Sequence, residues 1–368
     1  MRAVIADESS KLGDRLRQVV LGVGMDCGAA DRVSYANLRA RLTQAPADLV
    51  LVVLGPDRTD GLSLIQDLAR TNLPVLAVGP SSDSQQILQA LRAGARGYMD
   101  EAHLREELLS ALEKLHASGS VPFRRGQTIA VLAATPGAGV TTVASSLAFA
   151  LGERAPQRVS LAEVGSGVPD LALNLNLEPR HTVADLADHW ERLDAIMLRQ
   201  ALVEHSAGVS VLAYKPETLH TTPIQPTAMR QTIILLSALF DFTVLDLGHS
   251  TDVARLEALA LSTSVVLVVR LDVPSLRLTR QLIRQLGLQG LPQDKLRVVA
   301  NRYGQRKQVA WRKAAEVLGL PIQGWVPEDP GTLNQAHNNG LPLVRVARRA
   351  AITRTFDSLA LMLKNAAA

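Results

Sequence analysis

Short, uninterrupted apolar runs constrain this chain more than any other feature. LVLVVL at 49–54 and VVLVV at 265–269 are each bounded by polar residues. A strand with one solvated face alternates apolar and polar residues, whereas a strand buried on both faces of a parallel sheet is apolar throughout. Stretches of helical periodicity separate such runs by about ten to fifteen residues, which is typical of alternating strand and helix units. The pattern predicts a doubly wound α/β fold.

The alternation occurs twice, with one interruption. Residues 117–127, ASGSVPFRRGQ, contain Gly, Ser, Pro and basic residues without any period, which is typical of a linker. A length of 368 residues also favours two domains over one. We therefore expect a first domain at 1–116, a linker at 117–127 and a second domain at 128–368. The expected strands are 2–6, 49–54, 75–78 and 97–99, then 128–134, 158–162, 209–213, 242–246, 264–270 and 296–301, with a turn at 326–330.

Composition narrows the class of protein. With 47% hydrophobic and 20% charged residues, the chain has the apolar content for two cores and is not disordered. No apolar run approaches the roughly 20 residues that cross a bilayer. The first residues, MRAVIADESS, lack the charged-then-apolar order of a secretion signal. A single cysteine, Cys27, excludes a disulfide framework and a cysteine-built zinc site. We expect a cytoplasmic protein.

The net charge is only +4, and the basic residues are scattered along the chain. A solvated helix face is the simplest interpretation, and weak contact with nucleic acid or anionic lipid is the alternative. Aromatic residues make up 3% of the chain, so we expect no aromatic platform for bases beside these cations and no nucleic-acid partner. The two largest basic clusters are Arg345, Arg348, Arg349 and Arg354, and Arg302, Arg306, Lys307, Arg312 and Lys313.

The segment 128–151, TIAVLAATPGAGVTTVASSLAFAL, has the order strand, glycine-bearing loop, helix. Such a loop lets successive main-chain N–H groups surround phosphate oxygens, and the helix that follows directs its positive end at the same anion. We expect Gly137 and Gly139 to supply the backbone freedom, Thr141 a hydroxyl for magnesium, and Thr142 the start of the helix. A glycine turn with a purely structural role is the alternative.

Residues 1–116 resemble a response-regulator receiver domain, on IADE at 5–8, ADLVLVVLGPDRTDGL at 47–62 and GARGYMDE at 94–101. The resemblance places Asp7 and Glu8 at the magnesium-binding acidic pair. It places Val53 at the phosphate-accepting aspartate, Gly79 at the conserved hydroxyl and Glu101 at the conserved lysine. Valine has no nucleophilic oxygen, so Val53 cannot accept phosphate. We expect a pseudo-receiver with a docking or dimerisation surface, whose acidic pair is a solvated remnant.

The second domain resembles the MinD/ParA superfamily, whose loop reads K-G-G-x-G-K-T-T. In TPGAGVTT at 135–142 both lysines are absent, replaced by Thr135 and Val140. A lost charged hydrogen bond of about 1.5–3 kcal/mol weakens phosphate binding roughly 10–100-fold. The strand 242–246 resembles Walker B, and Glu163 and Gly165 stand where the family has D-x-D, so a water-orienting carboxylate is missing too.

The resemblance thus implies two doubly wound domains, a flavodoxin-like receiver followed by a P-loop MinD/ParA-like domain with a degenerate Walker A loop. It implies ATP and magnesium as weakly bound structural ligands. It leaves open whether the protein is an enzyme, and little or no ATP hydrolysis is the favoured interpretation. No catalytic residue is assigned. Magnesium would be held by Thr141 and Asp246. The implied nucleotide-contacting residues are Gly137, Ala138, Gly139, Val140, Thr141, Thr142, Asp246, Asn301, Arg302, Pro327 and Asp329.

Within the superfamily, the chain resembles the TadZ/CpaE group of tight-adherence (Flp, type IVc) pilus assembly. VVANRYGQRKQ at 298–308 and VPEDPGTLNQAHNNGLPLV at 326–344 are the most specific matches. The resemblance implies a homodimeric scaffold that marks a cell pole or the inner face of the membrane and recruits a pilus secretion ATPase. Two alternatives stay open. One is an active ATPase that positions a pilus, flagellar or cellulose-secretion apparatus, and the other is a partitioning protein that binds DNA or membrane surfaces.

Two further features have competing interpretations. His249 follows Asp246 closely, which permits a catalytic role, but a histidine after a strand is more often a hydrogen-bonded structural residue. Near the end of the sequence, Ile352, Phe356, Leu359 and Leu363 form a stripe at helical spacing. This stripe favours a helix that packs on the sheet over one that binds a membrane.

Overall fold

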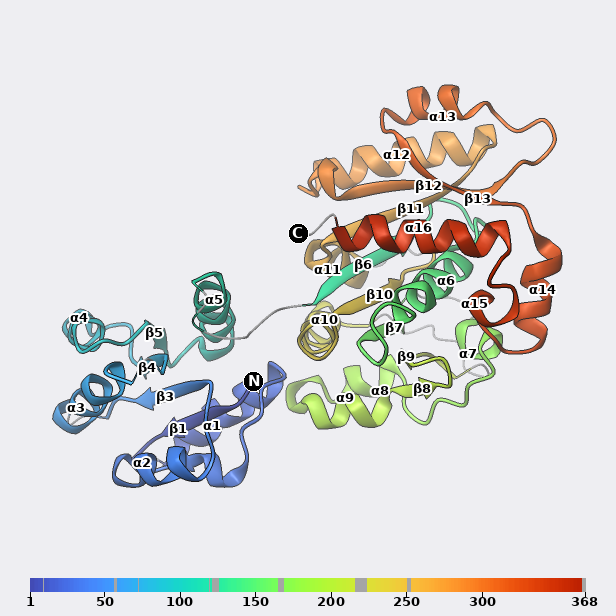
Figure 1. The fold of residues 1–368 in the computed structure, drawn as a ribbon. Coiled ribbons are helices and arrows are strands. Elements are labelled where there is room, and N and C mark those ends of the chain that lie inside the picture. Colours follow the sequence, from blue (N-terminus) through green and yellow to red (C-terminus); the bar gives the residue numbers. More distant parts are fainter. Residues whose placement is uncertain are drawn as a thin grey trace. The chain divides into compact units, whose positions relative to one another are not determined.

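The computed structural model of the chain describes residues 1–8, 10–55, 58–71, 73–118, 120, 126–164, 169–215, 224–249 and 253–365. The chain forms two compact units, Met1–Arg125 and Gly126–Ala368. Each has its own β-sheet with helices around it (Figure 1). Of the expected linker 117–127, residues 119 and 121–125 lie outside the described residues.

The described residues of the first unit form a five-stranded parallel sheet in the order β2-β1-β3-β4-β5. This is the strand order of flavodoxin-like folds. Helices α2, α3 and α4 cover one face, where Leu38, Ile65 and Ala90 join a single apolar cluster with the strands. Helices α1 and α5 pack against each other and cover the opposite face. The elements are β1 (Ala3–Ala6), α1 (Ser10–Gly22), η1 (Ala29–Asp31), β2 (Arg32–Val33), α2 (Tyr35–Gln44), β3 (Leu49–Val53), α3 (Arg58–Ala69), β4 (Val75–Gly79), α4 (Ser84–Arg92), β5 (Gly97–Asp100) and α5 (Leu104–Ala117).

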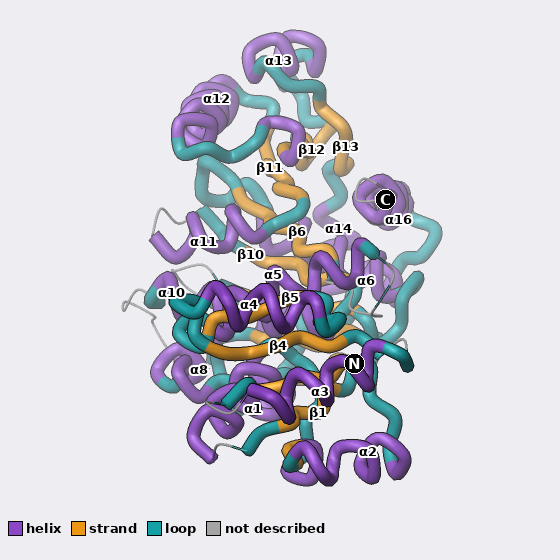
Figure 2. Tube along the Cα trace, turned by 90° about the vertical axis from the view of Figure 1, so that its left-hand side faces the viewer, coloured by secondary structure: helices purple, strands orange, loops and turns teal. Residues whose placement is uncertain are grey.

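The second unit has an eight-stranded sheet in its described residues, in the order β13-β12-β11-β6-β10-β7-β9-β8. Strand β8 runs antiparallel to β9, and the other neighbouring strands are parallel. Figure 2 shows the layers, with α10, α11 and α12 on one side of the strands and α6 and α16 on the other. The fold is therefore α/β with parallel sheets, as the apolar runs predicted.

The bounds of the second unit complete the description. They are β6 (Gln127–Leu132), α6 (Val140–Gly152), β7 (Val159–Glu163), α7 (Leu171–Asn174), α8 (Val183–Asp188), η2 (Trp190–Arg192), α9 (Ala195–Ala201), β8 (Val203–His205), β9 (Val209–Leu212), α10 (Pro226–Leu239), β10 (Phe242–Asp246), α11 (Val253–Leu261), β11 (Ser264–Arg270), α12 (Val273–Leu288), η3 (Gln293–Lys295), β12 (Leu296–Tyr303), α13 (Trp311–Leu318), β13 (Ile322–Pro327), α14 (Pro330–Asn338), α15 (Leu343–Val346) and α16 (Ala351–Asn365).

The last helix has the role that its apolar stripe predicted. Ile352, Phe356, Leu359 and Leu363 are buried, and α16 packs against α6 and β13. Gly324 in β13 makes this close packing possible, because a Cβ at that position would lie 2.6 Å from Leu359 Cδ2. Among the described helices, none is long and apolar enough to cross a membrane.

Three short strands escaped the sequence prediction: β2, β8 and β13. The expected turn at 326–330 is wrong in its first half, because Val326 and Pro327 still belong to β13. These strands lie at the edges of the two sheets, where one side of the strand is solvated and a continuous apolar run is not required.

Candidate nucleotide-binding site

The loop between β6 and α6 has the conformation that its glycines predicted. Gly137 and Gly139 have φ angles of +69° and +91°, in the left-handed region that favours glycine. Gly139 also has no room for a side chain, since a Cβ there would lie 2.3 Å from Asn301 Nδ2. Gly139 is the N-cap of α6, which begins at Val140. The helix therefore starts two residues before Thr142, and the expectation that Thr142 starts it is wrong.

This loop forms one wall of a cavity of about 360 Å³. The other walls come from the ends of β7, β9 and β10 and the residues that follow them. A cavity at the carboxyl ends of parallel strands, beside a helix N-terminus, is the usual ligand site of such sheets. The lining residues are Thr135, Pro136, Gly137, Ala138, Gly139, Val140, Thr141, Thr142, Glu163, Pro169, Asp170, Tyr214, Asp246, Gly248 and His249.

No lysine or arginine is among the described residues that line the cavity. The neighbouring segments 165–168, 216–223 and 250–252 lie outside the described residues, and their sequences, GSGV, PETLHTTP and STD, contain neither residue type. No lysine or arginine among the described lining residues therefore replaces the cationic side chains that bind phosphate in P-loop proteins. The basic residue nearest to this lining in sequence is Lys215, which follows Tyr214 and is exposed.

The two positions of the missing lysines have local roles instead. Thr135 is buried, and its Oγ1 lies 3.5 Å from Ser275 Oγ in α12. Val140, the first residue of α6, is only 7% exposed. Neither side chain carries charge toward the cavity, so main-chain N–H groups and the end of α6 are what remains to attract a phosphate.

Asp246 ends β10 at the base of the cavity and is 3% exposed. Burial raises the pKa of its carboxyl to about 6, opposed by hydrogen bonds from the Thr141 hydroxyl and the Gly248 N–H. The Gly248 nitrogen lies 3.1 Å from Asp246 Oδ1. A carboxylate and a hydroxyl in contact are the hard oxygen donors that magnesium prefers. Thr141 and Asp246 thus have the donor groups that magnesium requires, and magnesium binding by this pair stays a prediction.

Glu163 lies beside Asp246, as its register partner in the neighbouring strand β7. Its Oε1 accepts hydrogen bonds from the main-chain nitrogens of Asp170 and Leu171, at 3.2 and 3.4 Å. Its Oε2 accepts one from the Tyr214 nitrogen at 3.1 Å. Burial first, and the charge of Asp246 to a lesser extent, raise the pKa of Glu163 to about 7. Glu163 therefore ties the start of α7 and the end of β9 to β7.

Three acidic side chains line the cavity. Glu163, Asp170 and Asp246 line it together, and the charge of Asp170 contributes to the raised pKa of Asp246. His249 also lines the cavity, in the loop after β10. A nucleotide is itself polyanionic, so it needs a divalent cation here more than in a site with lysines. Gly165, the second position of the D-x-D pattern, lies outside the described residues.

Four of the implied nucleotide-contacting residues, Asn301, Arg302, Pro327 and Asp329, do not line this cavity. The side chain of Asn301 supports the phosphate loop from behind, since its Nδ2 donates a hydrogen bond to the Ala138 carbonyl at 2.7 Å. Arg302 is exposed, with a φ angle of +54°. Asp329 caps α14 by accepting from the Thr332 nitrogen at 3.1 Å. Pro327 pairs in register with Tyr303. Structural roles account for Asn301 and Asp329, and nucleotide contact by all four stays a prediction.

In the first unit, the acidic pair at the end of β1 is already engaged. The Asp7 carboxylate is fully buried and pairs with Arg32, whose Nη2 lies 3.1 Å from Asp7 Oδ2. Glu8 Oε1 accepts a hydrogen bond from the Tyr35 nitrogen at 2.8 Å. The expectation of a solvated pair is therefore wrong for Asp7, whereas Glu8 is exposed. The guanidinium of Arg32 compensates the buried charge of Asp7.

The other receiver positions are equally closed. Val53, at the end of β3, is 2% exposed. Its carbonyl accepts a hydrogen bond from the Tyr35 hydroxyl. A Cβ on Gly79 would lie 2.4 Å from Tyr98 Oη, so the Tyr98 side chain takes the space where a hydroxyl residue would stand. Glu101 donates its main-chain N–H to the Gly79 carbonyl at 3.0 Å. None of these three positions has a side chain that could play the part that the receiver resemblance gives it.

The fold and the cavity are those of a P-loop α/β protein. Over about 60% of its length, the chain is homologous to ATPases of the MinD/ParA superfamily. It is 27% identical over 226 residues to the septum site-determining MinD protein assigned in Oltmannsiellopsis viridis, covering 59% of this chain and 69% of that protein. It is also 29% identical over 104 residues to the transcriptional regulatory protein KdpE of Staphylococcus aureus, covering 26% of this chain and 44% of that protein. No family model matches the chain.

Solved structures share the fold of the MinD/ParA type. A ParA family ATPase from Chlorobium tepidum TLS aligns with a TM-score of 0.60 at 22% identity, covering 64% of this chain and 98% of its own. MinD from Pyrococcus horikoshii OT3, solved with Mg-ADP, aligns with a TM-score of 0.57 at 22% identity, covering 66% of this chain and 97% of its own. The MinC:MinD cell division protein complex of Aquifex aeolicus contains a chain that aligns with a TM-score of 0.56 at 20% identity, covering 65% of this chain and 96% of its own.

Proposed function

We propose that the chain is a positioning and scaffold protein of the MinD/ParA type whose nucleotide site binds weakly and hydrolyses little. The observation that carries this proposal is a cavity that keeps the phosphate-binding loop but is lined by three carboxylates and no lysine or arginine among its described residues. The homology to MinD supports a role in positioning, and the lining of the cavity supports the loss of turnover.

In this proposal the nucleotide phosphates bind the main-chain N–H groups of residues 137–140. They also contact the hydroxyl groups of Thr141 and Thr142. Thr141 and Asp246 would hold magnesium, which supplies the positive charge that the loop lacks. The loss of one charged phosphate contact weakens binding roughly 10–100-fold, so a micromolar site would become one of tens to hundreds of micromolar. Nucleotide would then occupy the site only at high concentration.

Turnover requires more than occupancy. A lysine in the loop stabilises charge that develops in the transition state, and none is present to do so. A carboxylate that orients water must also be free to accept a hydrogen bond from that water. Glu163 is the buried carboxylate beside Asp246, and its two oxygens already accept three main-chain hydrogen bonds. We therefore expect hydrolysis to be lost to a greater extent than binding.

We further propose that the chain belongs to the TadZ/CpaE group and serves tight-adherence pilus assembly at a cell pole. In this proposal the first unit is a pseudo-receiver that docks or dimerises, the residues near 117–127 are a linker, and the second unit is the degenerate ATPase domain. The pilus secretion ATPase would be the partner. The known complex of MinC with MinD supports the idea that this fold recruits a second protein.

Steady-state turnover of Mg-ATP by the purified full chain tests the enzymatic part of the proposal. We expect no turnover above that of the variant Asp246→Ala. Magnesium-dependent hydrolysis that Asp246→Ala abolishes would show an active ATPase instead. The variant Glu204→Gln is the control, because Glu204 is an exposed carboxylate on β8 that does not line the cavity.

Deletion of the gene tests the biological part. We expect loss of assembled Flp pili with flagella and cellulose secretion intact, and a fluorescent fusion of the full chain at one cell pole. Loss of flagella or of cellulose, with normal pili, would transfer the positioning role to those systems and contradict the pilus assignment.

A further inference from the structure

An exposed pair of tryptophans lies on elements that do not line the cavity. Trp311 begins α13 and Trp325 lies in β13, the edge strand of the eight-stranded sheet. Their ring centroids are 6.0 Å apart, with an angle of 78° between the ring planes. Trp311 is 40% exposed and Trp325 is 37% exposed. Large aromatic side chains left on a surface together often mark an interaction site.

Basic side chains accompany the pair. The Arg312 guanidinium lies 5.2 Å from the centroid of the Trp311 ring, which is a cation–π contact. Arg302, Arg306, Lys307, Arg312 and Lys313 are all exposed, and none forms an ion pair within the described residues. Between positions 302 and 328 the acidic residues are Glu316 and Glu328.

This arrangement corrects one expectation from the sequence. We expected no aromatic platform beside the basic clusters, yet Trp311 lies within one of them and contacts Trp325. The partner tryptophan is fourteen positions away along the chain, and only the fold brings the two rings together. Five cations against two carboxylates leave the region with a positive surplus.

We propose that Trp311, Trp325 and these five cations form a docking surface, here called the tryptophan surface, for an acidic segment of a partner protein. An apolar side chain of that segment would pack on the two indoles, and its carboxylates would meet the surrounding cations. Tryptophan and arginine are the residue types that most often dominate the energy of protein interfaces. Opposite charge adds specificity and speeds association.

The ring geometry favours a protein segment over single-stranded nucleic acid. A base that stacks needs an open indole face. Arg312 lies over Trp311, and the two indoles pack edge to face. The exposed parts of the pair therefore suit a compact aliphatic or aromatic side chain better than a row of flat bases.

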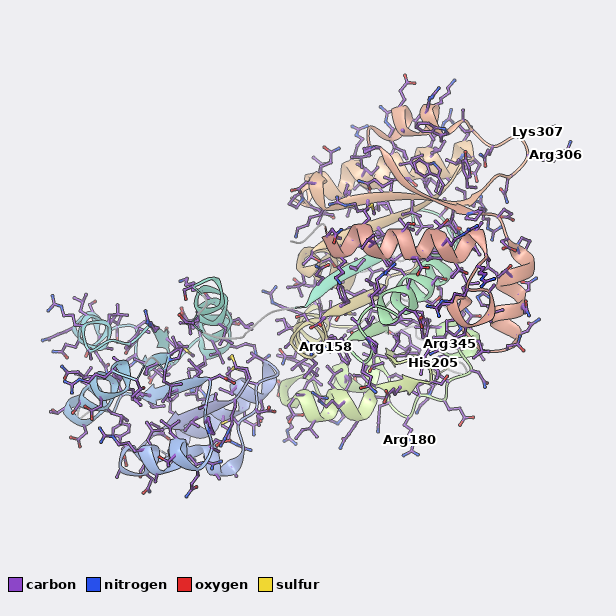
Figure 3. All side chains as sticks on the ribbon, viewed as in Figure 1. Arg158, Arg180, His205, Arg306, Lys307 and Arg345 are labelled. Atoms are coloured by element: carbon purple, nitrogen blue, oxygen red, sulfur yellow. The ribbon has the colours of Figure 1, made fainter. Side chains whose placement is uncertain are left out.

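The tryptophan surface can be tested separately from the nucleotide site. None of its seven residues lines the cavity. Arg302 is also one of the predicted nucleotide contacts, so the test uses the other residues of the surface and is carried out without nucleotide. Figure 3 shows Arg306 and Lys307 pointing outward from the loop between β12 and α13, whereas Arg180 lies at the opposite end of the second unit. Arg180 is also exposed and provides a matched charge control.

The experiment measures binding of a fluorescein-labelled, glutamate-rich peptide with one central phenylalanine to the full chain by fluorescence anisotropy, at low salt without nucleotide. We expect saturable binding that weakens as salt is added. Trp311→Ala should weaken it at least about tenfold, as removal of an interface anchor does. The double variant Arg306→Glu with Lys307→Glu should also weaken it, and Arg180→Glu should leave it unchanged. Replacing the phenylalanine of the peptide with glycine should cost a similar factor to Trp311→Ala.

Two results would overturn the inference. One is that the acidic peptide does not bind. The other is that it binds equally well to Trp311→Ala and to the double variant Arg306→Glu with Lys307→Glu. Tighter binding of oligo-dT or of phosphatidylglycerol vesicles, lost in the same variants, would assign the surface to nucleic acid or to membrane. Arg306 and Lys307 are exposed loop residues, so their replacement tests the surface even if Trp311→Ala disturbs α13.

Discussion

At the scale of single residues, position 140 decides what the cavity can bind. Val140 is the first residue of α6 and lines the cavity that the phosphate loop encloses. A valine there contributes no hydrogen bond and no charge, so the loop offers phosphate only its main chain. The loss of this one contact is reversible by mutation, because the surrounding backbone keeps its conformation, with Gly137 and Gly139 at positive φ.

Val140→Lys should therefore strengthen Mg-ATP binding roughly 10–100-fold, the inverse of the loss of one charged hydrogen bond. Competition against a fluorescent ATP analogue measures the change. Val140→Met is the matched control, since methionine has a similar length without charge, and it should leave affinity near that of the unmodified chain. Equal gains in both variants would mean that charge is not what the loop lacks.

The raised pKa of the Glu163 carboxyl leads to a second prediction for a single residue, about the stability of the protein as a function of pH. Folding raises its pKa to about 7 and that of Asp246 to about 6. An acid whose pKa is raised by folding keeps its proton longer in the folded state than in the unfolded state. Its contribution to stability is therefore lost as pH rises, from the unfolded value near 4.5 for Glu163 up to the folded value near 7.

Glu163→Gln removes that titration. Glutamine has one acceptor oxygen for the three main-chain N–H groups, which costs the variant stability by an amount independent of pH. On top of this, the free energy of unfolding of the variant relative to the unmodified chain should rise between pH 4.5 and pH 7, by on the order of 1–3 kcal/mol. Urea unfolding at several pH values measures the difference. Glu204, exposed on β8, provides the control Glu204→Gln. A free-energy difference between Glu163→Gln and the unmodified chain that does not change with pH would contradict the electrostatic account.

At the scale of elements, the sequence predicted the strands and helices whose buried faces leave a continuous or periodic apolar pattern. The central strands and their helices follow from apolar runs and helical period, and the packing of α16 follows from its four-residue stripe. The edge strands β2, β8 and β13 escaped because edge strands need no such run. In the candidate site, the loop glycines were predictable from their spacing. The hydrogen bond from the Tyr214 nitrogen to Glu163, the support from Asn301 and the Asp7–Arg32 pair were not predictable, because each joins residues distant along the chain.

Phe356 tests the packing of α16. It is 1% exposed and lies in the cluster that joins α16 to α6 and the sheet. Phe356→Ala should lower the free energy of unfolding of the second unit by about 3–5 kcal/mol, as large-to-small changes in a core do. All three tryptophans, Trp190, Trp311 and Trp325, lie in this unit, so tryptophan fluorescence in guanidinium reports it selectively.

The control for this helix is Leu361, which is 48% exposed on the same element. Leu361→Ala should change the free energy by about 0.5 kcal/mol or less. Similar losses in the two variants would show that α16 does not pack through its predicted stripe, contrary to the structure.

At the scale of the whole molecule, the two units share the α/β class with parallel sheets, and in the function that we propose neither unit carries out chemistry. In the proposed pseudo-receiver, Val53 stands at the phosphate-accepting position, and Arg32 pairs with the buried Asp7. The second unit has a phosphate loop without its lysines. We infer that selection has kept these folds for surfaces and binding, which accords with a scaffold.

The first unit should not accept phosphate. Incubation of the full chain with acetyl phosphate and magnesium should leave its mass unchanged by intact-protein mass spectrometry, because no carboxylate stands at the end of β3. A gain of one phosphoryl group, mapped to Asp48 or Asp60, would show that a neighbouring carboxylate has taken over and that the unit is still a switch.

The central claim is that the cavity has kept its main-chain amides but lost its cations, and one measurement tests it most directly. Isothermal titration of the full chain with Mg-ATP, and with ATP in EDTA, compares binding with and without the divalent cation. The account predicts a dissociation constant of roughly tens to hundreds of micromolar with magnesium and no measurable binding without it. Sub-micromolar binding, or binding of equal strength in EDTA, would contradict the account, because it would require a cationic side chain that this cavity does not have.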